Sequence, residues 1–116
     1  MSRKPAAAAK LAGAAPVFAA LGDTARLRIV QRLCDGGPLS ITRLTEGAQI
    51  SRQAVTKHLR ALEDAGLVRS DRAGRERIWE LRTKRLAEGR RYLDQIAAEW
   101  DGALARLRTF VERDKR

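Results

Sequence analysis

The chain has 116 residues, and its 24 lysine and arginine residues against 14 aspartate and glutamate residues give a formal charge of +10. This length predicts one small domain, and the charge favours a polyanionic partner without proving one. One cysteine and one histidine exclude a disulfide framework or an all-protein zinc cluster within a single chain. Because no apolar run approaches the roughly 20 residues of a membrane span, we expect a cytoplasmic protein, and we expect no membrane contact and no cofactor.

The start of the chain is rich in alanine and carries basic residues but no acidic ones. Early positive charge and A-x-A triplets also occur in secretory signals, but Lys10 and Pro16 interrupt this apolar stretch, which is built of alanine rather than leucine. We therefore expect residues 1–15 to be a flexible basic arm. Residues 16–113 are predicted to form a single domain, followed by a short tail at residues 114–116.

Three short helices are expected in the first half of the domain. The first begins at the domain start and ends at Gly22, and the second follows a cap at Asp23 or Thr24 and ends at Gly36. A third fits Ser40–Glu46. The expected apolar face of the second helix consists of Leu27, Ile29, Val30, Leu33 and Cys34.

The segment SRQAVTKHLRALEDAG gives the clearest helical pattern in the chain, over residues 51–65. Ser51 is a good N-cap, and Gly66 is a stop after four turns. An apolar face is made by Val55, Leu59 and Leu62, while the opposite face carries polar and basic residues. A short third helix joined to such a fourth through a glycine-containing turn is the helix-turn-helix arrangement.

After Gly66 the pattern changes to two short strands at residues 67–70 and 77–81. Gly74 supplies the positive φ that a tight hairpin needs between them. The hairpin is basic, with Arg72 and Arg75 at its tip. A basic hairpin directly behind a helix-turn-helix is interpreted as a wing, and the alternative is a solvated hairpin whose arginines only keep the protein soluble.

The last segment, Thr83–Arg113, contains only Gly89 and Gly102 as helix breakers, so its continuity through these glycines stays open. Apolar residues repeat every seven positions along it, which predicts an apolar stripe. A helix of about 30 residues is about 45 Å long, more than a domain of this size can cover. We therefore expect a second copy of the chain to cover the stripe; the alternative is a helix that folds back on its own domain.

The polar face of the helix at 51–65 suits duplex DNA, because a helix fits the major groove. Gln53 can read adenine there, whereas Arg52, Lys57 or Arg60 can read guanine or bind phosphate. A charged helix face alone is usually only solvated, so the inference depends on its place between a helix-turn-helix and a wing. The expected DNA-binding residues are Ser51, Arg52, Gln53, Thr56, Lys57, Arg60, Arg72, Arg75 and Arg77.

Two further side chains raise chemical hypotheses. His58 lies at the edge of an apolar face, where a hydrogen-bonded, partly buried histidine is favoured over a ligand. Cys34 ends an apolar helix, which favours a small core residue over a reactive thiol. The sequence has no glycine-rich phosphate loop, nucleophile elbow, catalytic triad or metal motif, so we do not expect an enzyme.

Two blocks, ALGDTARLRIVQRL and ISRQAVTKHLRALEDAGLVRSDRAGRERIWEL, resemble the ArsR/SmtB winged-helix transcriptional regulators, with a likeness that covers about Pro16 to Leu81. The resemblance implies a mainly α fold with a small β-hairpin, a winged helix-turn-helix with a long C-terminal dimerisation helix. It implies a small dimeric repressor that releases DNA when an effector binds, with a dimer interface on the first and last helices. The expected interface residues are Val17, Phe18, Leu93, Ile96, Trp100, Leu104, Leu107 and Phe110.

The known metal sites of this family are not matched. The arsenic- and cadmium-type site has two cysteines and an aspartate in the third helix, whereas the stretch Pro38–Leu44 has no thiolate and places Arg43 where the acid should be. The zinc-type site needs histidines on the last helix, and residues 83–116 contain none. The dithiol variant needs two cysteines per chain. Metal sensing through these sites is not expected, and the sequence does not name an effector.

The sequence therefore predicts a sequence-specific homodimeric repressor that binds an inverted-repeat operator through the helix at 51–65 and the wing at 67–81. One alternative is a non-specific architectural DNA-binding protein. Another is an interaction module whose terminal helix binds a different protein. Trp100 and Phe110 also allow a small-molecule pocket at the dimer interface, although core packing is the more usual role for such residues at helical spacing.

Overall fold

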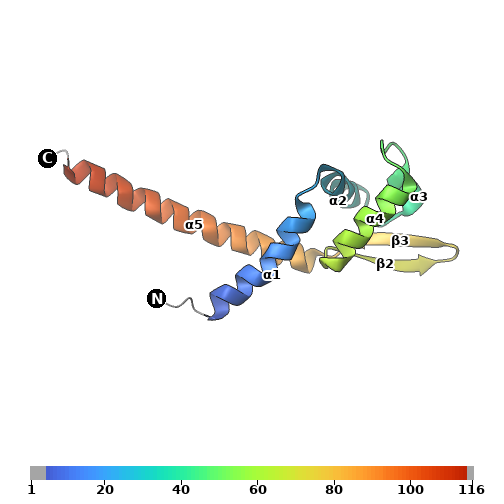
Figure 1. The fold of residues 1–116 in the computed structure, drawn as a ribbon, viewed down its shortest axis with the longest axis horizontal. Helices are drawn as coiled ribbons and strands as arrows, with labels where there is room; N and C mark the ends of the chain where they lie inside the picture. Colours follow the sequence, from blue (N-terminus) through green and yellow to red (C-terminus); the bar gives the residue numbers. More distant parts are fainter. Residues whose placement is uncertain (1–4, 115–116) are drawn as a thin grey trace.

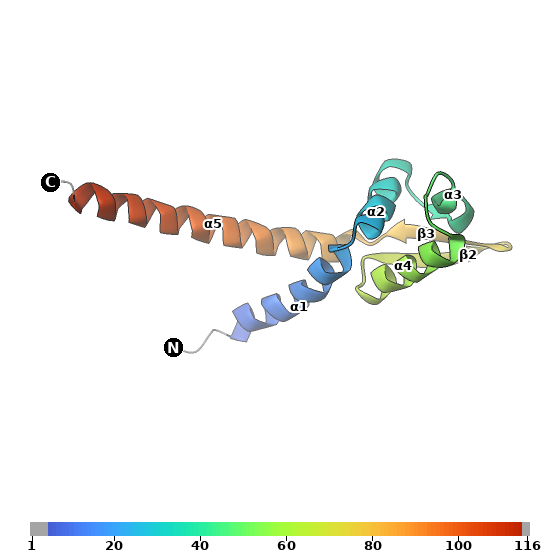
Figure 2. The same ribbon diagram turned by 45° about the horizontal axis from the view of Figure 1, so that its top comes forward.

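The computed structural model describes residues 5–114, with side chains from residue 12 onward. A body of three helices and a sheet lies at one end of the molecule, and the last helix extends away from it (Figures 1 and 2), so that the whole measures 72 × 31 × 20 Å. The elements are α1 Pro5–Leu21, α2 Thr24–Gly36, β1 Leu39–Ser40, α3 Ile41–Thr45, α4 Arg52–Asp64, β2 Val68–Ala73, β3 Glu76–Leu81 and α5 Thr83–Asp114. None of these helices is both long and apolar enough to span a bilayer.

The predicted mainly helical winged helix-turn-helix is confirmed, with one addition to the sheet. The strands are antiparallel in the order β1-β3-β2, so β3 lies in the middle. β1 pairs Leu39 with Trp79 and Ser40 with Ile78. The sequence did not indicate this strand, because two residues are too few to show an alternating pattern.

The core lies where α2, α3 and α4 pack on one face of the sheet. Val55, Leu59 and Leu62 of α4 are 0% exposed, as predicted from their helical spacing. Leu67 and Val68 continue this core directly after the α4 turn. The buried face of α4 therefore fixes which of its side chains remain in solvent.

The first helix begins at Pro5, so the expected flexible arm at residues 1–15 is corrected from residue 5 onward. Alanine has the highest helix propensity, and this alanine-rich run continues the helix through Pro16, although an interior proline costs about 3 kcal/mol. Ala14, Val17 and Ala20 are buried on one face of α1. Packing of this face stabilises the helix despite the proline.

The apolar face predicted for α2 is partly wrong. Ile29 and Leu33 are buried, but Leu27 is 50% exposed and Cys34 is exposed as well. The buried positions follow a face rotated from the one expected, because apolar residues on this helix outnumber the positions that α4 and the sheet cover. The expectation that Cys34 is a core residue is thereby corrected.

The last helix is continuous through Gly89 and Gly102 and ends at Asp114, one residue beyond the predicted domain end. Gly89 is the place where α1 crosses it, since a Cβ added there would lie 3.5 Å from Val17 Cγ1. Val17 is 2% exposed in this packing. It therefore has no surface to offer to a second chain, which corrects its assignment to the dimer interface.

The N-cap of α2 gives a prediction for acid stability. Asp23 accepts a hydrogen bond from the backbone N–H of Arg26 at 3.1 Å, and this bond lowers the pKa of the Asp23 carboxyl from its ordinary value. A lowered folded-state pKa means that the stabilisation is complete above the unfolded pKa of about 3.9 and is lost as the pH falls through the folded pKa. We expect the urea-midpoint gap between wild type and Asp23→Ala to be constant above about pH 5 and to close in acid.

Asp23→Asn is the matched control, because asparagine caps a helix without titrating. Its midpoint should fall less in acid than that of the wild type, whose cap is protonated there. If the difference in urea midpoint between wild type and Asp23→Ala is the same at about pH 6 and pH 3, the carboxylate does not stabilise the cap.

Candidate nucleic-acid interface

The start of α4 is set by a side-chain cap. Ser51 has an extended backbone, and its hydroxyl oxygen accepts a hydrogen bond from the backbone N–H of Ala54 at 3.1 Å. This satisfies one of the free N–H groups of the first turn and leaves the others pointing out of the helix end. Ser51 is exposed, so the start of α4 is open to an approaching phosphate.

Opposite its buried face, α4 presents a polar surface to solvent. Arg52, Gln53, Lys57 and Arg60 are all exposed, which places them as the sequence predicts. Thr56 is half-buried, and its hydroxyl donates to the backbone carbonyl of Arg52 at 2.9 Å. The Thr56 hydroxyl therefore offers an acceptor rather than a donor to a base edge.

The turn between α3 and α4 is held by a side chain that the sequence did not single out. Arg32 of α2 donates to the backbone carbonyl of Leu44 at 2.8 Å and to that of Glu46 at 3.0 Å. These bonds satisfy carbonyls at the C-terminal end of α3. Arg32 thus fixes where α3 ends and where the chain leaves toward α4.

The strands of the wing are longer than predicted, since β2 continues to Ala73 and β3 begins at Glu76, which leaves a two-residue turn. Gly74 has φ +64°, and no other residue of this turn has a positive φ. Positive φ at the first central position alone is the pattern of a type II′ turn, whose twist matches that of the strands. The glycine prediction is confirmed, and Arg75 lies beside it at the exposed tip.

The two faces of the wing differ in charge. Arg72 pairs directly with Arg77 in the register of β2 and β3, so the two side chains lie on one face. Side chains alternate along a strand, and this is the face that carries Val68 and Trp79 into the core below α4. Like charges directly opposite one another destabilise a hairpin, so this arrangement favours a bound anion.

The other face of the wing carries more acidic than basic side chains. Arg69 lies opposite Glu80, and its Nε donates a hydrogen bond to the Glu80 carboxylate. This bond raises the pKa of Arg69 further above its ordinary value, with a smaller contribution from the charge of Asp71. Arg69 therefore adds little net charge, and the basic side of the wing is the one that faces toward α4.

His58 is held in a hydrogen bond, as the sequence predicts. Arg26 Nε donates to His58 Nδ1 at 3.3 Å, and the Arg26 guanidinium also reaches the Ala20 carbonyl at 3.5 Å. His58 is half-buried between α2 and α4 in this arrangement. Within residues 5–114, no group of three or more His, Cys, Asp or Glu side chains is placed to hold a metal ion.

The far part of α5 carries an exposed apolar stripe. Leu93 is 52% exposed and Trp100 is 64% exposed, and similar values hold for Leu104, Leu107 and Phe110. Phe18 and Ile96 are half-buried. The centroid of the Phe18 ring lies 6.3 Å from the centroid of the Tyr92 ring. The structure thus places most of the expected interface residues on one open surface, without Val17.

Comparisons with known proteins agree with this geometry. The chain matches the family model of a helix-turn-helix domain over residues 21–71. It is 40% identical over 85 residues to the HTH-type transcriptional regulator Rv2034 of Mycobacterium tuberculosis, over 73% of this chain and 76% of that protein. It is also 43% identical over 68 residues to the uncharacterized HTH-type transcriptional regulator YuzN of Bacillus subtilis, over 53% of this chain and 74% of that protein.

A solved structure extends the likeness to the whole fold. The ArsR-like transcriptional regulator from Rhodococcus sp. RHA1 superposes with a TM-score of 0.75 at 39% sequence identity. The match covers 86% of this chain and 93% of that one. The chain therefore belongs to the ArsR/SmtB family of helix-turn-helix transcriptional regulators, which are DNA-binding proteins and not enzymes.

Proposed function

We propose that the protein is a homodimeric repressor that binds an inverted-repeat operator with α4 in the major groove. The observation that carries this proposal is the division of α4 into a buried apolar face and an exposed polar face. Its apolar face is 0% exposed at Val55, Leu59 and Leu62, while its polar face is open beside the basic side of the wing. No apolar side chain of α4 needs to leave the core for this polar face to enter a groove.

Within the groove, the first turns of α4 carry the base-reading side chains. Gln53 has the amide that pairs with adenine, and Arg52 or Arg60 has the fork that pairs with guanine. Lys57 supplies a charge for the backbone. The free N–H groups and positive dipole end at Ser51 strengthen a phosphate contact at the start of the helix.

The wing supplies positional contacts. Arg72 and Arg77 lie together on the side of the wing that faces toward α4, and a phosphate between them removes their mutual repulsion. Arg75 at the exposed tip reaches the adjacent minor groove or backbone. Such contacts fix orientation and carry little sequence information, so specificity rests mainly with α4.

The apolar stripe of α5 supports a homodimer. A monomer rarely leaves such a continuous series of large apolar side chains in water. Two copies joined along this stripe bury it, and a two-fold axis then places the two α4 helices on half-sites about one helical turn apart. A dimer over a promoter blocks access to it, which makes repression the proposed outcome.

The experiment is a fluorescence-polarisation titration against the upstream region of the protein's own gene and against a scrambled duplex. At about 150 mM salt, where non-specific binding is weak, we expect a preference of about 10³-fold for the native region. A promoter–reporter fusion then tests the sign, since a repressor lowers expression and an activator raises it.

Equal affinity for both duplexes at this salt would contradict sequence-specific binding at this promoter and favour the architectural alternative. Absence of binding to either duplex would overturn the DNA proposal and leave the interaction module. Selection from a random-duplex pool is the complementary measurement, because it detects a preferred site wherever it lies in the genome.

A further inference from the structure

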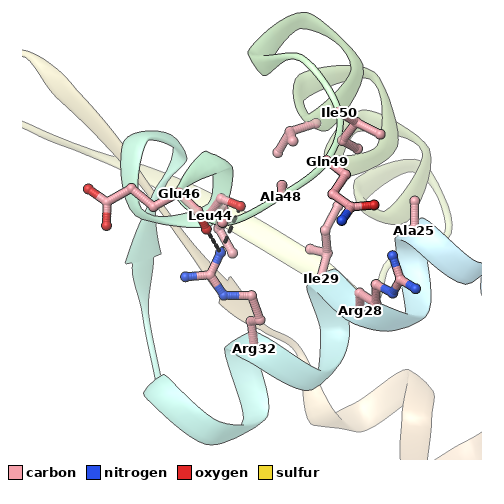
Figure 3. A pocket seen from close by; sticks show the side chains of 11 residues that line it. Ala25, Arg28, Ile29, Arg32, Leu44, Glu46, Ala48, Gln49 and Ile50 are labelled. Atoms are coloured by element: carbon pink, nitrogen blue, oxygen red, sulfur yellow. Dashed lines mark hydrogen bonds between the residues drawn. The ribbon is translucent and has the colours of Figure 1, made fainter.

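A cavity of about 590 Å³ lies between α2 and the turn that joins α3 to α4 (Figure 3). This volume falls in the range of small-molecule sites. The buried side chains of Ile29, Leu44 and Val55 lie beneath its floor, and Ala25, Ala48 and Ile50 are its more open apolar lining. The cavity thus combines a partly apolar lining with an opening to solvent.

Two arginines of α2 border the cavity one helical turn apart, and they differ in what they bind. Arg32 is engaged by the carbonyls of Leu44 and Glu46, as Figure 3 shows with dashed lines. Arg28 lies on the same side of α2, four residues earlier. Within the part of the chain that the structure describes, Arg28 has no hydrogen-bond or ion-pair partner among the protein groups.

No carboxylate of the cavity wall compensates this charge. Glu46 is the single acidic residue among those that line the cavity, and its side chain points away from it (Figure 3). The Glu46 carboxylate instead lies 3.8 Å from Arg43. An anion that enters the cavity therefore meets an unpaired guanidinium and no opposing negative charge.

The rim adds one apolar and one polar group from the turn. Ile50 lines the cavity and is 36% exposed, so part of its apolar surface is open to a ligand. Gln49 beside it carries an amide that can donate to or accept from a ligand. A ligand with an apolar body would cover Ile50 and gain the burial of that surface.

We propose that this cavity binds a small organic carboxylate with an apolar body. The carboxylate pairs with Arg28, and the body packs on Ile50, Ala48 and Ala25. The bound anion lies next to the residues that precede α4, so it repels an approaching phosphate and weakens DNA binding. This last, regulatory step rests on the proposed function, whereas ligand binding itself does not.

The test uses the full-length protein without DNA and follows backbone amide shifts in ¹H–¹⁵N NMR spectra during titration. Phenylacetate and octanoate are the anionic probes, and phenylacetamide is the neutral match of the first. We expect the anions to shift the amides of residues 46–50, and phenylacetamide to bind at least about 10-fold more weakly, as befits loss of a charge-assisted hydrogen bond.

Arg28→Gln removes the charge and keeps a shorter polar side chain, and it should weaken both anions by at least about 10-fold. Arg82→Gln is the matched control, since Arg82 is exposed near the end of the sheet and does not line the cavity. In the DNA titration, saturating phenylacetate should lower wild-type affinity about two- to fourfold, from one added charge per protomer near the phosphates.

Several results would overturn the proposal. These are shifts confined to the α5 stripe, no shift at residues 46–50 with either anion, or equal binding by wild type and Arg28→Gln. If Arg28→Gln lowers DNA affinity tenfold but leaves the probe shifts unchanged, Arg28 is a phosphate contact of the DNA interface instead. A protein that binds no DNA would refute the proposed function alone, because the amide titration contains no DNA.

Discussion

Substitution of Leu104 by glutamate is expected to separate the proposed homodimer into monomers and to lower operator affinity by about 10²- to 10⁴-fold. Leu104 is 54% exposed in the single chain, so a charge there leaves the core of the monomer intact. In the dimer, the same carboxylate would be buried without a partner, at a cost that no local rearrangement of the stripe offsets. The affinity falls because each monomer then holds only one half-site.

Sedimentation velocity at micromolar concentration measures the first effect, and fluorescence polarisation on the operator measures the second. Ala98→Glu is the matched control, because Ala98 is exposed on the opposite face of α5 and receives the same charge. It should remain dimeric and keep its operator affinity. A Leu104→Glu protein that sediments as a dimer would refute the α5 interface, provided its thermal unfolding matches that of the control.

Substitution of Gln53 by alanine is expected to remove discrimination between sequences rather than binding as such. A bidentate contact to adenine is worth about 1–3 kcal/mol against a wrong base, or about 5- to 150-fold for each half-site. The affinity for a scrambled duplex should change little, since Gln53 carries no charge. Arg60→Ala should also lower the ratio of operator to scrambled affinity, and additionally weaken both.

Arg75→Ala provides the contrast, because a wing-tip contact to phosphate contributes equally to the affinity for every duplex. It should weaken operator and scrambled DNA in parallel and reduce the salt slope by about 1 for each protomer. The measurement is a set of titrations on both duplexes at several salt concentrations. An unchanged specificity ratio in Gln53→Ala would show that the base-reading surface lies elsewhere than the predicted face of α4.

The recognition unit was predictable from the sequence because its signals are local. The Ser51 cap and the spacing of Val55, Leu59 and Leu62 together determine a helix and its buried side, and hence the side left for DNA. Gly74 predicted the hairpin for a similar reason, since a two-residue turn needs a positive φ. Each of these features depends on residues within a few positions of one another.

The errors arose where distant segments decide the outcome. Leu27 and Cys34 fit an apolar face on α2, yet the positions that α4 and the sheet cover are those of Ile29 and Leu33. The family resemblance placed Val17 at the dimer interface, yet α5 approaches so closely at Gly89 that Val17 is buried within its own chain. Helical periodicity gives the phase of a face but not the neighbour that packs on it.

The charged residues show the same division. That the wing is basic can be read from composition, but its partition into a basic face and a face with more acidic than basic side chains follows from the register that sets Arg72 opposite Arg77 and Arg69 opposite Glu80. Arg32, and not Arg28, reaches the carbonyls at the end of α3, and this depends on where α3 ends relative to α2. A one-residue change of register would invert the faces of the wing without any change in sequence.

By itself, the sequence determined the helices and the two strands of the wing, the buried and exposed sides of α4 and the unusual length of α5. Caps, turns and periodicity are properties of neighbouring residues, and they survive in any fold that the chain adopts. The tertiary structure decided the third strand, the face of α2 that is buried, the burial of Val17 and the cavity beside Arg28. These depend on contacts between segments far apart in the chain, and such contacts produce no periodic pattern in the sequence from which they could be predicted.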